Sequence, residues 1–582
     1  MRQFLFTLFV ICITFVYGHY QLPTSETTLR RLQSLQTTAT SARLRKDPFL
    51  VHRILSRTPK SLREKFQAKQ NENQRILELT DTPSLDCETC EFIVAVAQTI
   101  AENTTIVNET IAIIQEGCTA LDDPTITSIC DALIEGLVDI LPFLDQQLNT
   151  LAWDIPLGFC SVFFPVCQIN CCATPTNPEQ LFLSLTNDPN AWSITWTTGN
   201  MTATSTVQWG PTTNNCNNLP YSNNGNTRTY TVSSWIGTIH TAVMNNLIPG
   251  TSYTYRVGDN NGGWSECNNY TTFPSNIGTP EVPFVAVQIG DMDYNANDTI
   301  AAIQNIAPNI HAVLHIGDAS YADGFDIHFD EFEERVSVIY RTKPVLYCRG
   351  NHELWFNFTA YKARLGDSMP LAMDPNTSIL TANNGSYFSV DIGKYIHLTL
   401  FNTETPEDTA DVDADQATWI KNDLIHARTN PNMTWLIGGG HRPLYCTNGN
   451  SKNTDCGFFA PILRSQMEAI FNETRTDLLL FAHMHDYERF YPVYNSEIIS
   501  TDYTSPTVPI YVVNGAAQNR EGNELPSGNQ PYSPPHAQFA DVGYGLMTII
   551  ANINGPVGSN SLNYQFIRSK DSVVLDNFTI TK

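Results

Sequence analysis

Seven short apolar runs alternate with helical segments between residues 282 and 513, which is the pattern of a layered α/β domain with buried strands. The runs cover residues 282–289, 312–316, 344–347, 395–401, 435–437, 478–481 and 510–513. Most of them are followed by a side chain that can bind a metal, in chain order Asp291, Asp318, Asn351, His441 and His483. Because strand ends converge at one edge of such a sheet, these residues can meet in one crevice.

A single Asp after a strand usually caps a helix or a turn. Five such residues in order are not explained in that way, so the sequence predicts a metal site at the sheet edge. Between the first two runs, Ile300, Ile303 and Ile306 share one helical face, as an amphipathic crossover helix requires.

Residues 174–277 have a different pattern, in which short apolar runs are separated by turn signals. The runs lie at residues 181–185, 191–198, 204–209, 240–244, 251–257 and 270–273. This spacing predicts a β-sandwich of about seven strands. Cys216 and Cys267 lie inside it and are expected to pair.

The N-terminus predicts export. Arg2 and the apolar run from Phe4 to Val16 fit a signal peptide over residues 1–18, and the polar residues 19–83 fit a propeptide or flexible leader. No later apolar run is long enough for a membrane span. The expected destination is therefore the extracellular space or a lysosome. Eleven Asn-x-Ser/Thr acceptors agree with export: Asn103, Asn108, Asn200, Asn269, Asn297, Asn357, Asn376, Asn384, Asn432, Asn472 and Asn577.

Six cysteines lie in the apolar, helix-patterned segment 84–172, and their spacing alone allows fifteen disulfide connectivities. This segment resembles the saposin B-type family. The resemblance implies an all-α unit whose apolar inner face can bind lipid, stapled by the pairs Cys87–Cys167, Cys90–Cys160 and Cys118–Cys130. A stapled helical cap that touches no lipid is an equally good interpretation, because fold does not imply function.

The net charge of −25 argues against a nucleic-acid partner. Residues 19–86 carry twelve Lys/Arg against seven Asp/Glu, so the rest of the chain is more acidic than the total indicates. A phosphate substrate would then need a local positive centre, which a bound metal supplies.

The metal-capable residues belong to five short motifs: "GDMD" (290–293), "GDASY" (317–321), "GNHE" (350–353), "GGGH" (438–441) and "AHMH" (482–485). In this order they resemble the calcineurin-like metallophosphoesterases, and the Tyr of "GDASY" narrows the resemblance to purple acid phosphatases. "HRPLYC", "HDYERFYPVYN" and "YVVNGAAQNREG" extend it over roughly residues 174–582. In that family the catalytic β-sandwich is flanked by helices and follows a fibronectin type III-like domain, here expected at 280–582 and 174–277.

The resemblance implies that a ferric ion is bound by Asp291, Asp318, Tyr321 and His485. Asp318 would also bridge to a divalent iron, zinc or manganese ion held by Asn351, His441 and His483. The chemistry agrees, because a hard trivalent ion favours carboxylate and phenolate, whereas imidazole and amide oxygen suit a divalent ion. Two ions about 3.5–4 Å apart can grip one phosphoryl group while an activated water attacks phosphorus in line.

His352 is implied to contact the substrate phosphate together with Asn351, and to protonate the leaving oxygen. The alternative is a histidine that only orients Asn351.

The sequence departs from the family at Asp293 and Ala482, where Gly is usual. Asp293 could bond locally in a turn or alter the charge at the ferric site. Cys446 and Cys456 are expected to close a loop by a disulfide, whereas Cys171, Cys172 and Cys348 have no evident partner.

These features predict a secreted acid phosphatase that hydrolyses phosphate monoesters or anhydrides. One alternative is a sphingomyelinase-like phosphodiesterase, which Tyr321 and the sandwich domain argue against. Another is a non-catalytic lipid-binding glycoprotein, although random change would not be expected to spare all seven predicted ligands.

Overall fold

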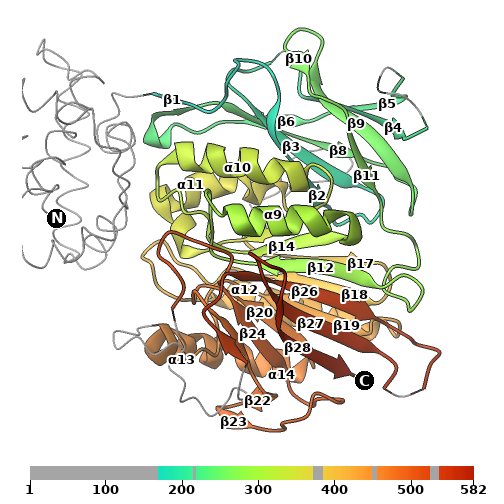
Figure 1. Cartoon of the computed structure of the whole chain (residues 1–582), viewed down its shortest axis with the longest axis vertical. Helices are drawn as coiled ribbons and strands as arrows, with labels where there is room; N and C mark the ends of the chain where they lie inside the picture. Colours follow the sequence, from blue (N-terminus) through green and yellow to red (C-terminus); the bar gives the residue numbers. More distant parts are fainter. Residues whose placement is uncertain are drawn as a thin grey trace, which may run out of the picture. The chain divides into compact units, whose positions relative to one another are not determined.

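The computed structural model describes residues 168–582 apart from 203, 214–215, 217, 371–384, 448–454, 525–536 and 557 (Figure 1). The chain divides into two compact units, Met1–Gln168 and Ile169–Lys582, and only the second is described below. The predicted signal peptide, the propeptide, the three saposin-like disulfides and nearly all of segment 84–172 lie outside the described residues. Strand β1 (Ile169–Asn170) pairs with β7 (Trp235–Ile236), so residues 169–172 lie in the second unit.

A β-sandwich forms the first part of this unit. One sheet has the order β2-β3-β8-β6 and the other β10-β9-β4-β5, with β11 also paired to β9. Their bounds are β2 Glu179–Leu185, β3 Trp192–Thr198, β4 Thr206–Pro211, β5 Tyr221–Asn224, β6 Asn226–Arg228, β8 Thr238–Met244, β9 Ser252–Asp259, β10 Gly263–Trp264 and β11 Asn268–Thr271. All six predicted runs are strands, and Cys216 is bonded to Cys267 as expected.

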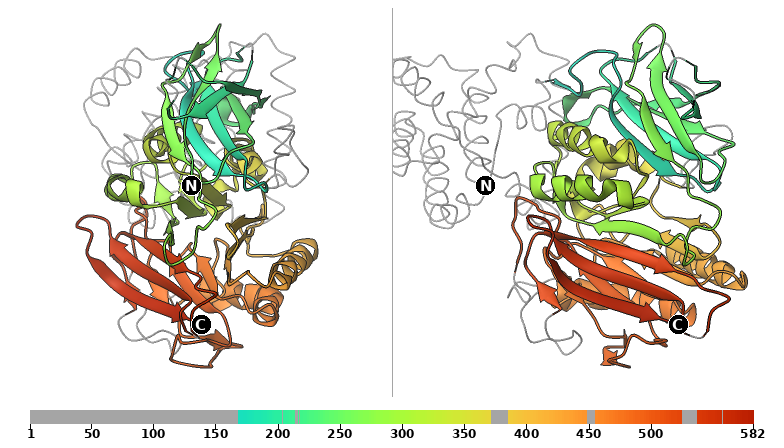
Figure 2. Two further views of the ribbon diagram at one scale, coloured as in Figure 1. Left: turned by 90° about the vertical axis from the view of Figure 1, so that its right-hand side faces the viewer. Right: turned by 45° about the vertical axis from the view of Figure 1, so that its right-hand side comes forward.

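Two larger sheets follow (Figure 2). The six-stranded sheet has the order β16-β14-β12-β26-β27-β28 and the seven-stranded sheet β17-β18-β19-β20-β24-β21-β25. The first contains β12 Phe284–Ile289, β14 Ala312–Ile316, β16 Val345–Cys348, β26 Gly543–Ile550, β27 Ser561–Arg568 and β28 Val574–Thr581. The second contains β17 Phe388–Ile392, β18 Ile396–Leu400, β19 Trp435–Gly439, β20 Leu478–Phe481, β21 Tyr487–Arg489, β24 Ile510–Asn514 and β25 Gln538–Phe539. All seven predicted runs are therefore strands.

Helices cover the outer faces of the two sheets. Their bounds are α9 Asn297–Ile306, α10 Asp326–Tyr340, α11 Trp355–Arg364, α12 Ala414–Thr429, α13 Ala460–Leu463 and α14 Ala469–Glu473. Helices α9 to α11 lie between the β-sandwich and the six-stranded sheet (Figure 1). The predicted crossover helix is α9, which buries Ile300 and Ile303.

Strand β20 shows how the layers are assigned, because successive side chains of a strand point to opposite faces. Leu478 and Leu480 join the core shared with the six-stranded sheet, whereas Leu479 and Phe481 join the core that includes side chains of α12 and α14. Such a strand is buried on both faces and reads as a continuous apolar run.

A buried polar contact joins the two sheets close to their carboxyl edge. Asn514 Nδ2 at the end of β24 donates to the Gln288 carbonyl of β12 at 3.2 Å, and Tyr564 OH donates to Gln288 Oε1 at 2.5 Å. All three side chains are fully buried. Buried hydrogen bonds favour one packing arrangement over others, so this contact contributes to how the strand ends of the two sheets face each other.

A buried charge cluster joins the sandwich to α10 and α11. Arg364 pairs with Asp330 at 2.8 Å and with Glu333 at 2.6 Å, and its Nε donates to Tyr230 OH of the sandwich at 2.6 Å. Asp326 accepts from the same hydroxyl at 3.0 Å, and its Oδ2 is buried without a hydrogen bond.

Because of this cluster, we expect the stability of the folded protein to depend on pH. Burial raises the pKa of Asp326 to about 7, with Arg364 opposing the shift. The proton bound to Asp326 therefore stabilises the fold fully below the ordinary pKa near 4, and this stabilisation is lost as pH rises through about 7. Asp326→Asn should reduce the fall in unfolding temperature between pH 4 and pH 8, by roughly a few degrees. Asp415→Asn, an exposed change on α12, is the control. A fall in Asp326→Asn equal to that of wild type would contradict the assignment.

Candidate metal centre

The predicted ligands lie where strands end and the chain turns sharply. Asp291 after β12, Asp318 after β14 and His483 after β20 have φ of 59°, 51° and 69°. Non-glycine residues are uncommon in this left-handed region and cluster at functional sites. The turns after β12 and β14 are tied together, because β13 (Met292–Asp293) pairs with β15 (Ala319–Ser320).

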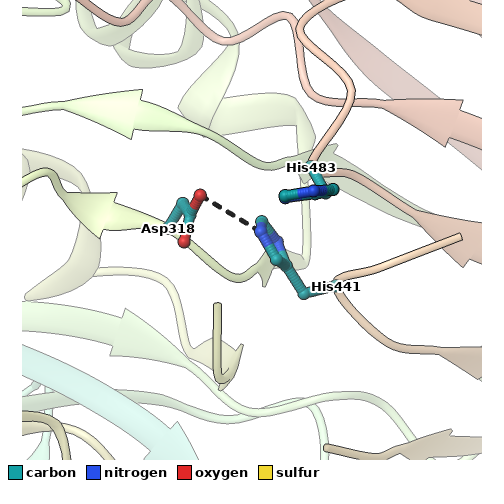
Figure 3. Close-up of side chains that lie close together, drawn as sticks. All are labelled: Asp318, His441 and His483. Atoms are coloured by element: carbon teal, nitrogen blue, oxygen red, sulfur yellow. Dashed lines mark ion pairs between the residues drawn. The ribbon is translucent and has the colours of Figure 1, made fainter. Parts of the chain in front are cut away.

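Asp318, His441 and His483 form a group in which one ligand atom of each residue lies within 4.8 Å of the others (Figure 3). His441 Nε2 is 3.1 Å from Asp318 Oδ2 and 3.2 Å from Asn351 Oδ1. The other ring nitrogen, Nδ1, lies 2.9 Å from the Ile316 carbonyl. Since a carbonyl only accepts, Nδ1 carries a hydrogen and Nε2 is the nitrogen that faces the group.

Asp291, Tyr321 and His485 form a second group beside the first. Tyr321 OH donates to Asp291 Oδ1 at 3.2 Å and lies 2.9 Å from His485 Nε2. His485 Nδ1 is 3.3 Å from the Gly522 carbonyl, so Nε2 again faces inward. The structure thus brings all seven predicted ligands into two adjoining groups, linked where the His483 amide donates to Asp291 Oδ2 at 2.7 Å.

The electrostatics of both groups suit cations. Burial, together with the carboxylates of Asp291 and Asp318, raises the pKa of Tyr321 well above 10. Burial lowers the pKa of His441, but Asp318 and Asp291 outweigh it and raise this pKa to about 10. Buried carboxylates thus hold protons on neighbouring ligands, and metal ions could take the place of those protons. The donor set of carboxylate, phenol, amide and imidazole fits a binuclear centre.

His352 lies against this centre. Its backbone amide donates to Asp318 Oδ1 at 2.8 Å, and its Nε2 is 3.7 Å from Asp318 Oδ2. Its Nδ1 lies 2.7 Å from Asp323 Oδ1. Burial lowers the pKa of His352, but Asp323 and Asp318 raise it well above its usual value. The ring is therefore held by Asp323 and can carry a proton beside the centre.

Two supporting residues were not predicted from the sequence. Asp323, which orients His352, lies two positions after the "GDASY" motif. This closeness to the motif in the sequence was the only feature that pointed to it. Glu353 accepts from the amides of Asp318 at 3.0 Å, Ala319 at 2.8 Å and Gly350 at 2.7 Å. Glu353 therefore joins the "GNHE" turn to the "GDASY" turn, although its place inside "GNHE" gave no indication of this role.

The structure explains both departures from the usual motifs. Asp293 pairs with Arg520, whose Nε donates to Asp293 Oδ2 at 2.6 Å. The extra negative charge is therefore compensated locally and does not need to act on the metal ligands. A Cβ on Gly290 would lie 2.3 Å from the Ala482 Cβ, so the missing side chain at 290 makes room for the alanine.

The remaining cysteine and glycosylation predictions can be compared with the described residues. Cys446 and Cys456 are bonded as predicted, and Cys171 pairs with its neighbour Cys172. Cys348 is the free cysteine of the described part and is buried. The sequons at Asn200, Asn269, Asn297, Asn357, Asn432 and Asn577 are exposed, that at Asn472 is partly exposed, and the other four lie outside the described residues.

Comparison with known proteins gives the family. The purple acid phosphatase N-terminal domain matches residues 178–272, the calcineurin-like phosphoesterase domain residues 284–487, and the iron/zinc purple acid phosphatase-like C-terminal domain residues 508–577. Acid phosphatase type 7 of Mus musculus is 31% identical over 58% of this chain and 78% of its own length. The chain belongs to the purple acid phosphatase family. Acid phosphatase type 7 of Danio rerio is 29% identical over 65% of this chain and 86% of its own.

A purple acid phosphatase from yellow lupin seeds has the same fold, with a TM-score of 0.57 and 22% identity over 70% of this chain and 75% of that one. Family membership makes this chain a phosphoester hydrolase of the binuclear-metal type. Within the described residues of this purple acid phosphatase, no helix is long and apolar enough to cross a membrane.

Proposed function

We propose that this purple acid phosphatase hydrolyses phosphate monoesters at acidic pH with one ferric and one divalent ion. The observation that carries the proposal is the division of the buried donors into two groups. Asp291 and Tyr321 offer anionic oxygen beside His485, whereas Asn351, His441 and His483 offer neutral donors. Hard trivalent ions favour the first set, and divalent iron, zinc or manganese the second.

In this proposal Asp318 would be shared by the two ions, since its carboxylate borders the divalent group and its backbone joins the turn of Asp291. When bound, the two ions supply an activated water and neutralise charge on the phosphoryl group. The protein contributes by holding the metal-binding atoms in place. The inner nitrogens of His441 and His485 are set by the carbonyls of Ile316 and Gly522.

His352 is proposed to contact the substrate phosphate and to protonate the leaving oxygen, with Asn351 contributing to the same phosphate contact. Asp323 holds Nδ1, so Nε2 is the atom that can deliver a proton. The alternative role, in which His352 only orients Asn351, would leave the leaving group without a proton donor of this kind. A general acid of this type typically contributes about 10² to 10⁴-fold to the rate.

Several finer features remain proposals drawn from the sequence. They are export through residues 1–18, removal of 19–83, glycosylation at the exposed sequons, and a saposin-like segment at 84–172 that either binds lipid or caps the enzyme.

The substrate class can be tested with the purified full chain across acidic and neutral pH. The test compares an aryl phosphate monoester, the matching aryl diester and sphingomyelin in vesicles. We expect the monoester to be hydrolysed fastest, and more so at acidic pH. A faster diester or sphingomyelin rate would overturn the monoester assignment while leaving the phosphoesterase family intact.

A further inference from the structure

The three histidines of the centre are held in two different ways. His441 and His485 each place their outer nitrogen near a backbone carbonyl. His483 instead places Nε2 3.0 Å from a side-chain oxygen, Asp455 Oδ1. A backbone carbonyl cannot be removed by substitution, whereas Asp455 can, so the position of His483 depends on a residue outside the five motifs.

The contact with Asp455 also decides which nitrogen of His483 carries the hydrogen. A carboxylate accepts hydrogen bonds and donates none when ionised, so Nε2 must carry the hydrogen. The lone pair is then on Nδ1. Arg442 Nη1 lies 3.1 Å from Nε2 and donates to the same Asp455 Oδ1 at 2.6 Å. Two donors thus share one carboxylate oxygen.

Arg442 is itself held from three sides, which keeps Asp455 in place. Its Nε donates to Glu404 Oε2 at 2.7 Å, and its Nη2 donates to Asp408 Oδ1 at 2.6 Å. Arg442 is 4% exposed. Asp408 and Asp455 are therefore comparable partners of one guanidinium, and Asp455 in addition contacts His483.

A disulfide brings Asp455 to this position. Asp455 directly precedes Cys456, which is bonded to Cys446, five residues after His441. The Cys456 sulfur also lies 4.0 Å from the Met484 sulfur, between the two histidines of "AHMH". The disulfide thus fixes the residue next to Asp455 onto the two loops that carry His441 and His483.

We propose that Asp455 is a positioning residue for the divalent metal, which fixes the His483 tautomer, and that the Cys446–Cys456 disulfide sets the affinity of that metal by holding Asp455 in place. The inference rests on the proposed binuclear function. It adds that the affinity for the divalent metal, but not for the ferric ion, depends on the loop closed by this disulfide. Carboxylates that hold metal-binding histidines typically change metal affinity about 10 to 100-fold when removed.

The test measures zinc affinity directly. The full chain is stripped of metal, reloaded with ferric iron, and titrated with zinc against a chromogenic chelator. We compare wild type, Asp455→Ala, Asp455→Asn and the matched control Asp408→Ala. We expect Asp455→Ala to weaken zinc binding about 10 to 100-fold and Asp455→Asn, which keeps an acceptor oxygen, to lie between. Asp408→Ala should stay close to wild type, and iron content should be unchanged throughout.

The disulfide is tested in the same assay with Cys446→Ser/Cys456→Ser, and with Cys216→Ser/Cys267→Ser in the sandwich as control. Only the first pair should weaken zinc binding. Unfolding temperatures of the metal-free proteins show whether each variant folds, and Asp455→Asn keeps the test valid if the alanine variant does not. Equal zinc affinity in wild type and Asp455→Ala, or an equal loss in Asp408→Ala, would overturn the inference. A wild-type chain that binds no metal would instead overturn the proposed function.

Discussion

Replacement of Asp318 by asparagine is expected to abolish hydrolysis almost completely while the fold survives. Asp318 is fully buried, and its carboxylate is the proposed bridge between the two metals. Asparagine has the same shape but no charge, and it offers one oxygen in place of two. A metal clamp contributes several kcal/mol, and each 1.36 kcal/mol is tenfold in rate, so we expect a loss of about a thousandfold or more.

Metal content and unfolding temperature distinguish this outcome from misfolding. The Asp318→Asn protein should hold less than two metals per chain, and its metal-free form should unfold near the temperature of metal-free wild type. Asp415→Asn, an exposed change on α12, should alter neither quantity. A variant with wild-type activity and two bound ions would rule out the bridging role.

Replacement of Tyr321 by phenylalanine is expected to remove the visible colour. If the phenolate binds Fe(III), the wild-type protein should be violet from ligand-to-metal charge transfer, also when zinc is the divalent ion. The variant keeps the buried ring but loses the hydroxyl that contacts Asp291 and His485. Ferric affinity should fall, whereas the change in packing should cost less than about 1.5 kcal/mol.

Tyr361→Phe is the matched control, because Tyr361 is also fully buried and its hydroxyl donates to the Tyr347 carbonyl at 3.4 Å. It should keep the visible band. A colourless, fully active wild-type protein that contains two zinc ions would contradict the ferric assignment. The two-metal hydrolase would remain in that case.

The strands of the catalytic sheets could be predicted because they are buried on both faces. The runs at 312–316 and 478–481 coincide with β14 and β20, since continuous burial demands an unbroken apolar segment. Strands β26 to β28 were not predicted because apolar and polar residues are mixed along them. In β27, for example, buried and partly exposed residues alternate along most of the strand. In the sandwich, β5 and β6 were missed because they consist of Asn, Ser, Thr, Tyr and Arg.

The ligands could be predicted because each lies within a short motif, whereas their supports could not. Asp323 and Asp455 act through contacts made only in the folded chain, and Asp455 comes from a loop with no motif of its own. The pairing of Asp293 with Arg520 likewise joins residues more than two hundred positions apart. Such partners depend on tertiary structure, which local sequence patterns do not encode.

The central claim, that two metals at the sheet edge carry out the hydrolysis, is tested most directly by a metal titration of activity. The full chain is stripped of metal, and monoester hydrolysis is measured as ferric iron and zinc are added back. We predict no hydrolysis without metal and full activity when one iron and one zinc are bound per chain. Undiminished hydrolysis by the metal-free chain, or full activity with a single bound ion, would contradict the account.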